Sequence, residues 1–211
     1  MMDNIYFVVD NEIIYPADYG LILKAFDVAD PEPKIYRYSI DGRDGDLDMT
    51  DWAGETKYNN RAVSAQFRGM EDSKWSDFAN LINGKMCKIF HSSSRDYYYN
   101  GRCSSVNHVV SQHVTDGELQ FTCDPYRMAI VDSSVYVAST NSAQISLSVM
   151  RKTVVPIINC SAACTLTDGS KTYNLSSGNN TIADFMIMRQ PKTVTITGTA
   201  NVTFTWKDGI L

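Results

Sequence analysis

The chain has 211 residues with a formal net charge of −5, and 44% of its residues are hydrophobic. This balance is typical of one or two globular domains and excludes disorder over most of the length. No apolar run approaches the roughly 20 residues of a membrane-spanning helix, and the acidic start at residues 1–4 lacks the basic residues of a signal peptide. We therefore expect a soluble chain without an export signal.

The charge is unevenly distributed. Residues 1–71 carry 7 basic and 14 acidic side chains, whereas residues 128–211 carry 6 basic and 4 acidic ones. Neither part has the basic surface that binding to a phosphate backbone requires, so direct nucleic-acid binding is not expected. An acidic part joined to a mildly basic part favours association with other protein surfaces.

The first third of the chain has strand-like patterns around a polar excursion. Alternating β-branched and aromatic residues predict strands at Ile5–Val9 and Ile35–Ile40. Two Asp-Gly turn signals follow within residues 41–45, and the alternation in Ala62–Phe67 predicts the next strand. The polar residues between these strands are expected to form a loop or a hairpin.

One segment has helical periodicity. Four apolar residues share a face at spacings i, i+3, i+4 and i+7, namely Trp75, Phe78, Ala79 and Ile82. We expect Asp72 or Ser73 to cap the start of this helix and Asn83-Gly84 to end it. Strand-like runs then resume at Met86–Phe90, Tyr97–Arg102, Val106–Val110 and Glu118–Cys123.

From residue 128 onward the sequence is rich in Ser, Thr, Val and Ile and poor in charge. Apolar residues alternate over residues 145–149, 154–158 and 194–206, with turns at Asp168-Gly169, Ser177–Asn179 and Asp208-Gly209, which predicts a small antiparallel β-sandwich. We therefore predict an all-β fold with one main helix, made of two β-sandwich-like domains at residues 1–127 and 128–211.

One acidic run has the spacing of a calcium loop. Asp44, Asp46, Asp48 and Glu55 fall at positions one, three, five and twelve of an EF-hand pattern. Position six is Met49 instead of Gly, and no helix is predicted on either side, so a solvated acidic turn or an ion-pair surface between subunits is favoured over a metal site. The histidines at 91, 108 and 113 and the five cysteines lack the spacing of a zinc site. No metal and no cofactor are expected.

No nucleophile elbow and no phosphate-binding glycine loop occur in the sequence. A pair of Asp or Glu carboxylates acting as a glycoside hydrolase stays open, because carboxylates are numerous. Tyr97, Tyr98 and Tyr99 could form a surface that binds a sugar or a protein partner, or they could belong to a half-buried strand.

The order of the motifs between residues 35 and 127 resembles the N-terminal domain of bacteriophage distal tail (Dit) proteins of siphovirus-type phages. The motifs are Ile40–Leu47, Tyr58–Arg61, a helix ending at Leu81–Lys85, a Tyr-rich strand closing on Gly101-Arg102, and Phe121–Tyr126. Residues 128–211 match by type only, as a small sandwich where this family often has a galectin-like domain.

This resemblance implies a structural virion protein without catalytic activity, synthesised in the cytoplasm of a bacterial host and placed at the tail tip. It implies a homo-hexameric ring that joins the tail tube protein to the tail-associated hub protein, with no membrane insertion. Interface candidates are Arg43, Asp44, Asp46, Asp48, Arg61 and Arg102. As a hypothesis, Arg61 and Arg102 orient the Asp-rich loop by salt bridges within or between subunits.

Three other functions remain alternatives. The first is a carbohydrate- or receptor-binding module of the tail tip that uses the C-terminal sandwich and Tyr97–Tyr99. The second is a glycan hydrolase with a carboxylate pair. The third is a tail-tube subunit, which would stack into long tubes instead of single or double rings.

Overall fold

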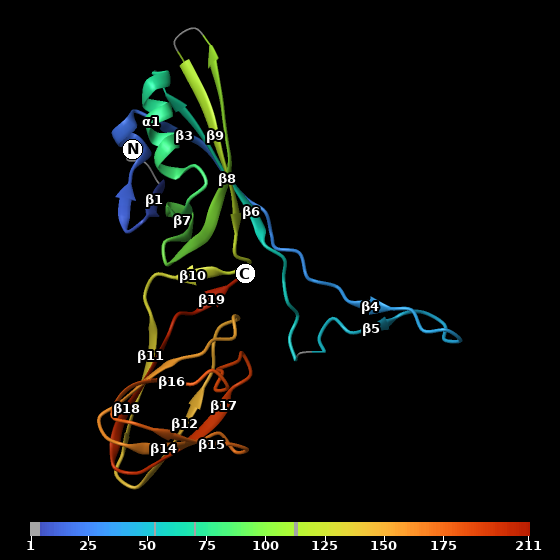
Figure 1. Cartoon of the computed structure of the whole chain (residues 1–211), viewed down its shortest axis with the longest axis vertical. Coiled ribbons are helices and arrows are strands. Elements are labelled where there is room, and N and C mark those ends of the chain that lie inside the picture. Colours follow the sequence, from blue (N-terminus) through green and yellow to red (C-terminus); the bar gives the residue numbers. More distant parts are fainter. Residues whose placement is uncertain (1–4, 53, 70, 112–113) are drawn as a thin grey trace. The chain divides into compact units, whose positions relative to one another are not determined.

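The computed structural model describes residues 5–52, 54–69, 71–111 and 114–211 (Figure 1). The chain divides into two compact units, of which the first runs up to Arg127 and includes Leu211, and the second is Met128–Ile210. The described residues form antiparallel strands with a single α-helix, so the predicted all-β fold with one main helix is confirmed. No helix in this part of the chain has the length and apolar character to cross a bilayer.

The first unit is built on one antiparallel sheet with strand order β2-β1-β7-β8-β9-β6-β3. The strands are β1 (Ile5–Val9), β2 (Glu12–Ile14), β3 (Ile22–Val28), β6 (Arg61–Gly69), β7 (Met86–His91), β8 (Tyr97–Ser111) and β9 (Val114–Cys123). Two short 3-10 helices, at Pro16–Tyr19 and Ser92–Ser94, connect strands.

Strand β8 joins two halves of this sheet, one made of β2, β1 and β7 and the other of β9, β6 and β3. Its first part pairs with β7, and its second part, from Gly101 to Ser111, pairs with β9. A register shift between Cys103 and Ser105 lets the strand continue, so the two strands predicted at 97–102 and 106–110 are one strand. The bulge interrupts the alternation of side chains in the sequence, but the backbone continues through it as a strand.

The sheet is bent so that its halves face each other. Strands β1 and β9 are separated by β7 and β8, which on a flat sheet would place them about 14 Å apart. The rings of Phe7 on β1 and Phe121 on β9 are nevertheless 5.6 Å apart, and Phe7 also lies 6.4 Å from Phe67 on β6. The first unit is therefore sandwich-like, with its core between the two halves and the helix.

Helix α1 (Asp72–Ile82) covers one face of the sheet in this unit (Figure 1). Its buried residues are the four predicted ones, Trp75, Phe78, Ala79 and Ile82. The predicted cap is wrong, because Glu71 is the N-cap and makes no side-chain cap bond, while Asp72 is already helical. The first helical bond runs from Trp75 N–H to the Glu71 carbonyl at 3.3 Å.

A long hairpin, which we call the arm (residues 30–60), connects β3 to β6. It contains β4 (Arg37–Tyr38) and β5 (Leu47–Asp48), which pair with each other, so the predicted strand at 35–40 is present only at its centre. Further backbone bonds tie its two sides together, from Lys34 N–H to the Lys57 carbonyl at 2.8 Å and from Met49 N–H to the Tyr36 carbonyl at 2.8 Å.

The second unit is a sandwich of two four-stranded sheets, as predicted. One sheet has the order β11 (Ser133–Ser139), β18 (Ala200–Trp206), β13 (Ile157–Cys160) and β16 (Gly178–Thr181). The other has the order β12 (Ser142–Leu147), β17 (Lys192–Thr197), β14 (Cys164–Thr167) and β15 (Thr172–Leu175). The short strands β10 (Arg127–Ala129) and β19 (Gly209–Ile210) pair with each other.

The alternation of apolar residues over 194–206 covers two strands in different sheets. Strand β17 ends at Thr197, and Gly198 follows with a φ of 119°, a backbone conformation that side chains disfavour. Strand β18 then begins at Ala200 in the opposite sheet. The core between the sheets contains Phe185, Phe204 and a set of aliphatic side chains.

Candidate functional site: an exposed arm

The arm has no core of its own. None of its described residues is buried, although the segment contains several large apolar side chains. Those with the largest exposed fractions include Trp52 at 72%, Ile35 at 59%, Tyr38 at 58% and Ile40 at 44%. Of these, Ile35 and Trp52 line one groove, and exposed apolar side chains that gather on one surface are typical of interaction sites. A two-stranded hairpin is also marginal alone in water, so the arm is suited to being covered by another surface.

One side of the arm is concave. Pro33, Ile35, Met49 and Trp52 line a groove of about 670 Å³, together with polar residues of both hairpin strands. Two of the polar lining residues form an ion pair across the hairpin, with Arg37 Nε 3.7 Å from Asp48 Oδ2. The Asp48 carboxylate also accepts a bond from Thr50 N–H at 2.9 Å, and these interactions lower the pKa of Asp48, with the Thr50 bonds making the larger contribution. The groove therefore has apolar walls and a fixed polar edge.

Three predicted interface residues lie near the tip of the arm. Arg43, Asp44 and Asp46 are exposed, and none of them makes an ion pair with another described residue. Gly42 and Gly45, with φ values of 82° and 73°, form the turns that surround them. The tip thus presents charged side chains that have no ion-pair partner in the part of the chain that the structure describes.

Among the described residues, Arg61 and Arg102 contact side chains and backbone outside the Asp-rich loop, and their salt bridges to that loop, within or between subunits, stay a prediction. Arg61 is only 3% exposed, and its guanidinium lies 5.6 Å from the centre of the Tyr99 ring. Burial lowers the pKa of Arg61, and its Nε and Nη2 atoms have no hydrogen-bond partner among the described residues. Arg102 donates to the Gly84 carbonyl at 2.6 Å, so it fastens the turn after α1.

Of the three tyrosines, Tyr98 and Tyr99 are buried and Tyr97 is partly buried. Tyr98 is 9% exposed and stacks on Phe90 with ring centroids 5.2 Å apart. Tyr99 is 5% exposed on the core side, and the ring of Tyr97 lies 5.8 Å from the guanidinium of Arg127. Adjacent residues of a strand point to opposite faces, so β8 is covered on both sides at Tyr98 and Tyr99, whereas the expected strand was buried on one side only.

An aromatic row on the first unit was missed at the sequence level. Tyr6 stacks on Phe90 with centroids 4.5 Å apart, and it also contacts Tyr15 at 5.6 Å. Phe90 in turn stacks on Tyr98, so four rings run across neighbouring strands of the sheet. They lie on the side away from the core, because Tyr6 alternates with buried Ile5 and Phe7. Only the strand pairing, Tyr6 opposite Phe90, brings them together, and no local pattern shows it.

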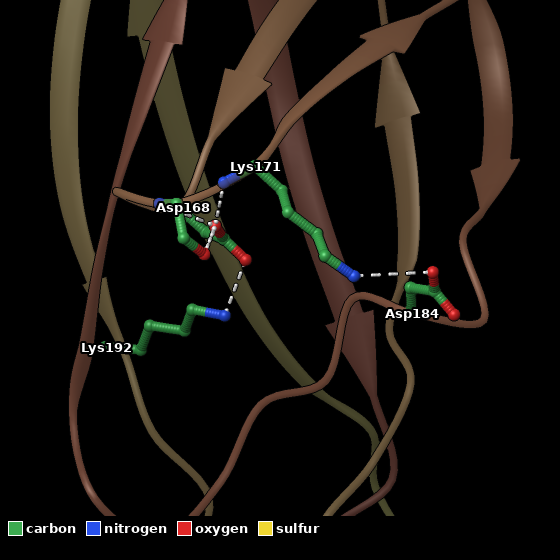
Figure 2. A network of polar contacts seen from close by, with 5 residues as sticks. Asp168, Lys171, Asp184 and Lys192 are labelled. Atoms are coloured by element: carbon green, nitrogen blue, oxygen red, sulfur yellow. Dashed lines mark hydrogen bonds and ion pairs between the residues drawn. The ribbon is translucent and has the colours of Figure 1, made fainter.

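In the second unit, the main charged cluster is structural. Figure 2 shows Asp168 between two lysines, accepting from Lys192 Nζ at 2.7 Å and from Lys171 N–H at 2.9 Å, while Lys171 Nζ lies 3.6 Å from Asp184. The Asp168 side chain is 4% exposed, and the bond from Lys192 is the largest cause that lowers its pKa far below the usual range. These bonds join the β14–β15 turn to β17.

The remaining reactive groups are held in the cores or in local contacts. All five cysteines are buried thiols outside any disulfide, and burial raises the pKa of Cys87 and of Cys123 to about 12. His91 Nδ1 lies 2.7 Å from Ser93 Oγ, and His108 Nε2 lies 3.4 Å from Asp72. His113 lies outside the described residues. In the described ranges, no group of three His, Cys, Asp or Glu side chains is placed to hold a metal ion.

Comparison with known sequences gives no match, neither among protein-family models nor among curated proteins. The structure is similar to that of the Dit protein (gp 19.1) of phage SPP1, described as a paradigm of the hub adsorption apparatus in phages that infect Gram-positive bacteria. The TM-score is 0.68 at 14% sequence identity, over 98% of this chain and 99% of that chain.

Two structures of the phage p2 baseplate in its activated conformation are more distant. The calcium-bound one has a TM-score of 0.49 at 7% identity, over 95% of this chain and 97% of that chain. The strontium-bound one has a TM-score of 0.47 at 7% identity, over 96% and 98%. At 14% identity the SPP1 similarity shows a common fold, which confirms the expected resemblance to distal tail proteins at that level.

Proposed function

We propose that this chain is a structural protein of a phage tail tip. In this proposal six copies form a ring at the distal end of a long non-contractile tail, and the ring joins the tail tube protein to the tail-associated hub protein. The observation that carries it is the similarity to SPP1 Dit over 98% of the chain, which includes both units. The function is positional, and no chemical step is assigned to any residue.

The arm supports self-assembly. A closed ring is built from heterologous contacts, so each subunit must present two different complementary patches. The arm is one such patch, because it is unburied, carries Tyr38, Ile40 and Trp52 in exposed positions, and has an acidic tip. The outer side of the first-unit sheet, which carries the aromatic row, is a candidate for the second patch. Its exposed side chains include Ile13, Tyr15 and Met86, with exposed fractions of 56%, 43% and 45%.

The charges at the arm tip suit a contact that sets register. Exposed charge pairs add little affinity, but they steer encounter and reject misaligned partners. Arg43, Asp44 and Asp46 are available for this role, while Asp48 is already engaged by Arg37 and Thr50. Arg61 is not assigned to the interface, since its side chain is buried in its own chain. Arg102 is exposed and donates to the Gly84 carbonyl, and it stays a predicted interface residue.

The mass of the native protein over a concentration series tests the proposal. We expect a hexamer or a pair of hexamers for the wild type, and smaller species for Tyr38→Ala and Trp52→Ala. Tyr136→Ala on β11 is the matched control, because Tyr136 is 61% exposed and Tyr38 is 58% exposed. A wild type that stays monomeric at every concentration contradicts the ring, and open tubes of growing length would point to a tail-tube subunit.

A further inference from the structure

Two buried thiols face each other between the two sheets of the second unit. Cys160 is the last residue of β13 in one sheet, and Cys164 is the first residue of β14 in the other. Their sulfur atoms are 3.9 Å apart, with the Cys164 thiol donating toward Cys160. Cys160 is 2% exposed and Cys164 is 7% exposed, so both side chains point into the sandwich.

The turn between the two cysteines is fastened on both sides. Ser161 N–H donates to the Asn201 carbonyl at 2.9 Å, and Asn201 N–H donates to Ser161 Oγ at 2.8 Å. The Ser161 carbonyl also accepts from Ser177 Oγ at 3.2 Å. These bonds fix the backbone at the corner where the chain crosses from one sheet to the other, so the approach of the thiols is built into the fold.

Gly198 leaves room beside Cys164. A Cβ atom at position 198 would lie 3.3 Å from the Cβ of Cys164, a tight contact that Gly198 avoids. A disulfide needs sulfur atoms about 2.05 Å apart, and rotation about the Cα–Cβ bonds is the motion that brings neighbouring thiols to this distance. The two sulfur atoms, 3.9 Å apart, must therefore approach by about 1.9 Å for the bond to form.

We propose that Cys160 and Cys164 form a disulfide that links the two sheets when the folded protein leaves a reducing compartment for oxidising surroundings. The bond chemistry is independent of the proposed tail-tip function, which supplies only the setting, because a released virion leaves the reducing cytoplasm. The other three cysteines belong to the core of the first unit and are not part of this pair.

The oxidant is a low-molecular-weight disulfide, and the reaction is thiol–disulfide exchange. The Cys164 thiolate attacks one sulfur of the small disulfide, which forms a mixed disulfide and expels one small thiolate. The Cys160 thiolate then attacks the Cys164 sulfur and expels the second small thiolate. Two electrons pass from the protein to the small disulfide, and the two cysteine protons end on the two small thiols.

The order of attack follows from position. Cys164 is next to the exposed Ala163 at the surface turn, whereas burial raises the pKa of Cys160 to about 12 and keeps its thiol protonated at neutral pH. Local opening of the turn is thus needed before the small disulfide enters. We expect slow oxidation of the native protein, followed by closure of the mixed disulfide once the adjacent Cys160 thiol has lost its proton.

The experiment treats the full-length native protein with oxidised glutathione at mildly alkaline pH. The protein is then unfolded, alkylated and cleaved with trypsin. Both cysteines fall in one tryptic peptide, Thr153–Lys171, which we expect to be two hydrogen atoms lighter and to carry no alkyl group. The peptide Cys103–Arg127 is an internal control, because it holds Cys103 and Cys123 and should be alkylated twice. Reduction should restore alkylation of the first peptide.

Stability and single variants give a second readout. A disulfide that restricts the unfolded chain should raise the melting temperature of the second unit by roughly 5 to 10 °C in the wild type. Cys160→Ala should show no such rise and should stop at a glutathione adduct on Cys164. A wild-type peptide that stays fully alkylated, or that loses alkylation only after the protein is unfolded, overturns the proposal. The oligomeric state does not enter this readout, so failure of the ring leaves it intact.

Discussion

Gly117 and Trp75 are in direct contact across the interface between β9 and α1. A Cβ atom at position 117 would lie 2.3 Å from Cη2 of Trp75 and within 2.5 Å of two further ring atoms. The Trp75 side chain is 1% exposed and contacts Phe67 and Phe78, so it has little room to move aside. The glycine is what allows the helix to lie this close to the sheet.

Gly117→Ala should therefore destabilise the first unit by about 1 to 3 kcal/mol through overpacking. Thermal unfolding measures this loss, and Thr122→Ala at an exposed position of the same strand is the control. Adding Trp75→Phe removes the outer ring atoms that clash. The double variant should then be less destabilised than the sum of the two single variants. Additive losses would mean that the added methyl group does not meet the indole ring.

Asp168→Ala should destabilise the second unit by about 2 to 3 kcal/mol. The change leaves Lys192 and the backbone N–H of Lys171 without their acceptor. Asp184→Ala is the control, since its 73% exposed side chain holds a 3.6 Å pair that should contribute little. Chemical denaturation of both variants measures the difference, and equal losses would contradict a role that is specific to the buried carboxylate.

The same carboxylate predicts an acid dependence of stability. The pKa of Asp168 is lowered in the folded state, so its contribution is complete above the unfolded pKa of about 3.9 and is lost as pH falls toward the folded value. Unfolding of the wild type followed from neutral to acidic pH should show this loss. In Asp168→Asn the curve should be flatter below about pH 4, and parallel curves would contradict the assignment.

Two substitutions of Arg61 should distinguish the effect of its charge on stability from the effect of its side-chain volume. Arg61→Met removes the guanidinium, whose buried Nε and Nη2 atoms have no hydrogen-bond partner among the described residues, at the cost of the contact with Tyr99. We expect stability equal to or above that of the wild type, because unpaired buried charge is unfavourable. Arg61→Ala leaves a cavity and should be less stable than Arg61→Met. The midpoints of denaturant unfolding test this order, and a large loss in Arg61→Met would show that its charge is needed.

Charge reversal at the arm tip should affect assembly and leave folding unchanged. Asp44→Lys combined with Asp46→Lys removes no ion pair between described residues, so the melting temperature of the monomer should be unaltered. Light scattering at low salt should show weaker association, and the difference should shrink as salt is added. Asp77→Lys, at an exposed position of α1, is the control. Unchanged association at low salt would remove the tip charges from the interface.

The spacing of apolar residues was sufficient to predict a helix or strand where that element buries one face. The four apolar positions of α1 and the alternation in Ile5–Val9 were read correctly because both periodicities are complete within the segment. The start of the helix was placed wrongly, since Asp72 is a common N-cap type but the chain is already helical there. Strand β3 was not predicted as a separate strand, because its mixed sequence ILKAFDV lacks a clean alternation and a bulge shifts its register.

Features that depend on pairing between distant segments could not be predicted from the sequence. The burial of Arg61 depends on Tyr99, 38 residues away, coming to lie beside it in the fold, and an arginine ordinarily indicates the surface. The aromatic row depends on the register between β1 and β7. The acidic residues of the arm were predicted from their charge to form an interaction surface, which stays a prediction, and the exposed Trp52 and its groove required the structure.

The continuity of β8 has a mechanical consequence. Since this strand is shared by both halves of the bent sheet, covalent backbone carries any load from one half to the other. The halves can separate only if the hydrogen bonds between β8 and β7, or between β8 and β9, are broken. A force along the axis of β8 would act on all the hydrogen bonds of a strand pair at once, in shear. A sheet built this way resists stretching along β8 far better than it resists the separation of its outer strands β2 and β3.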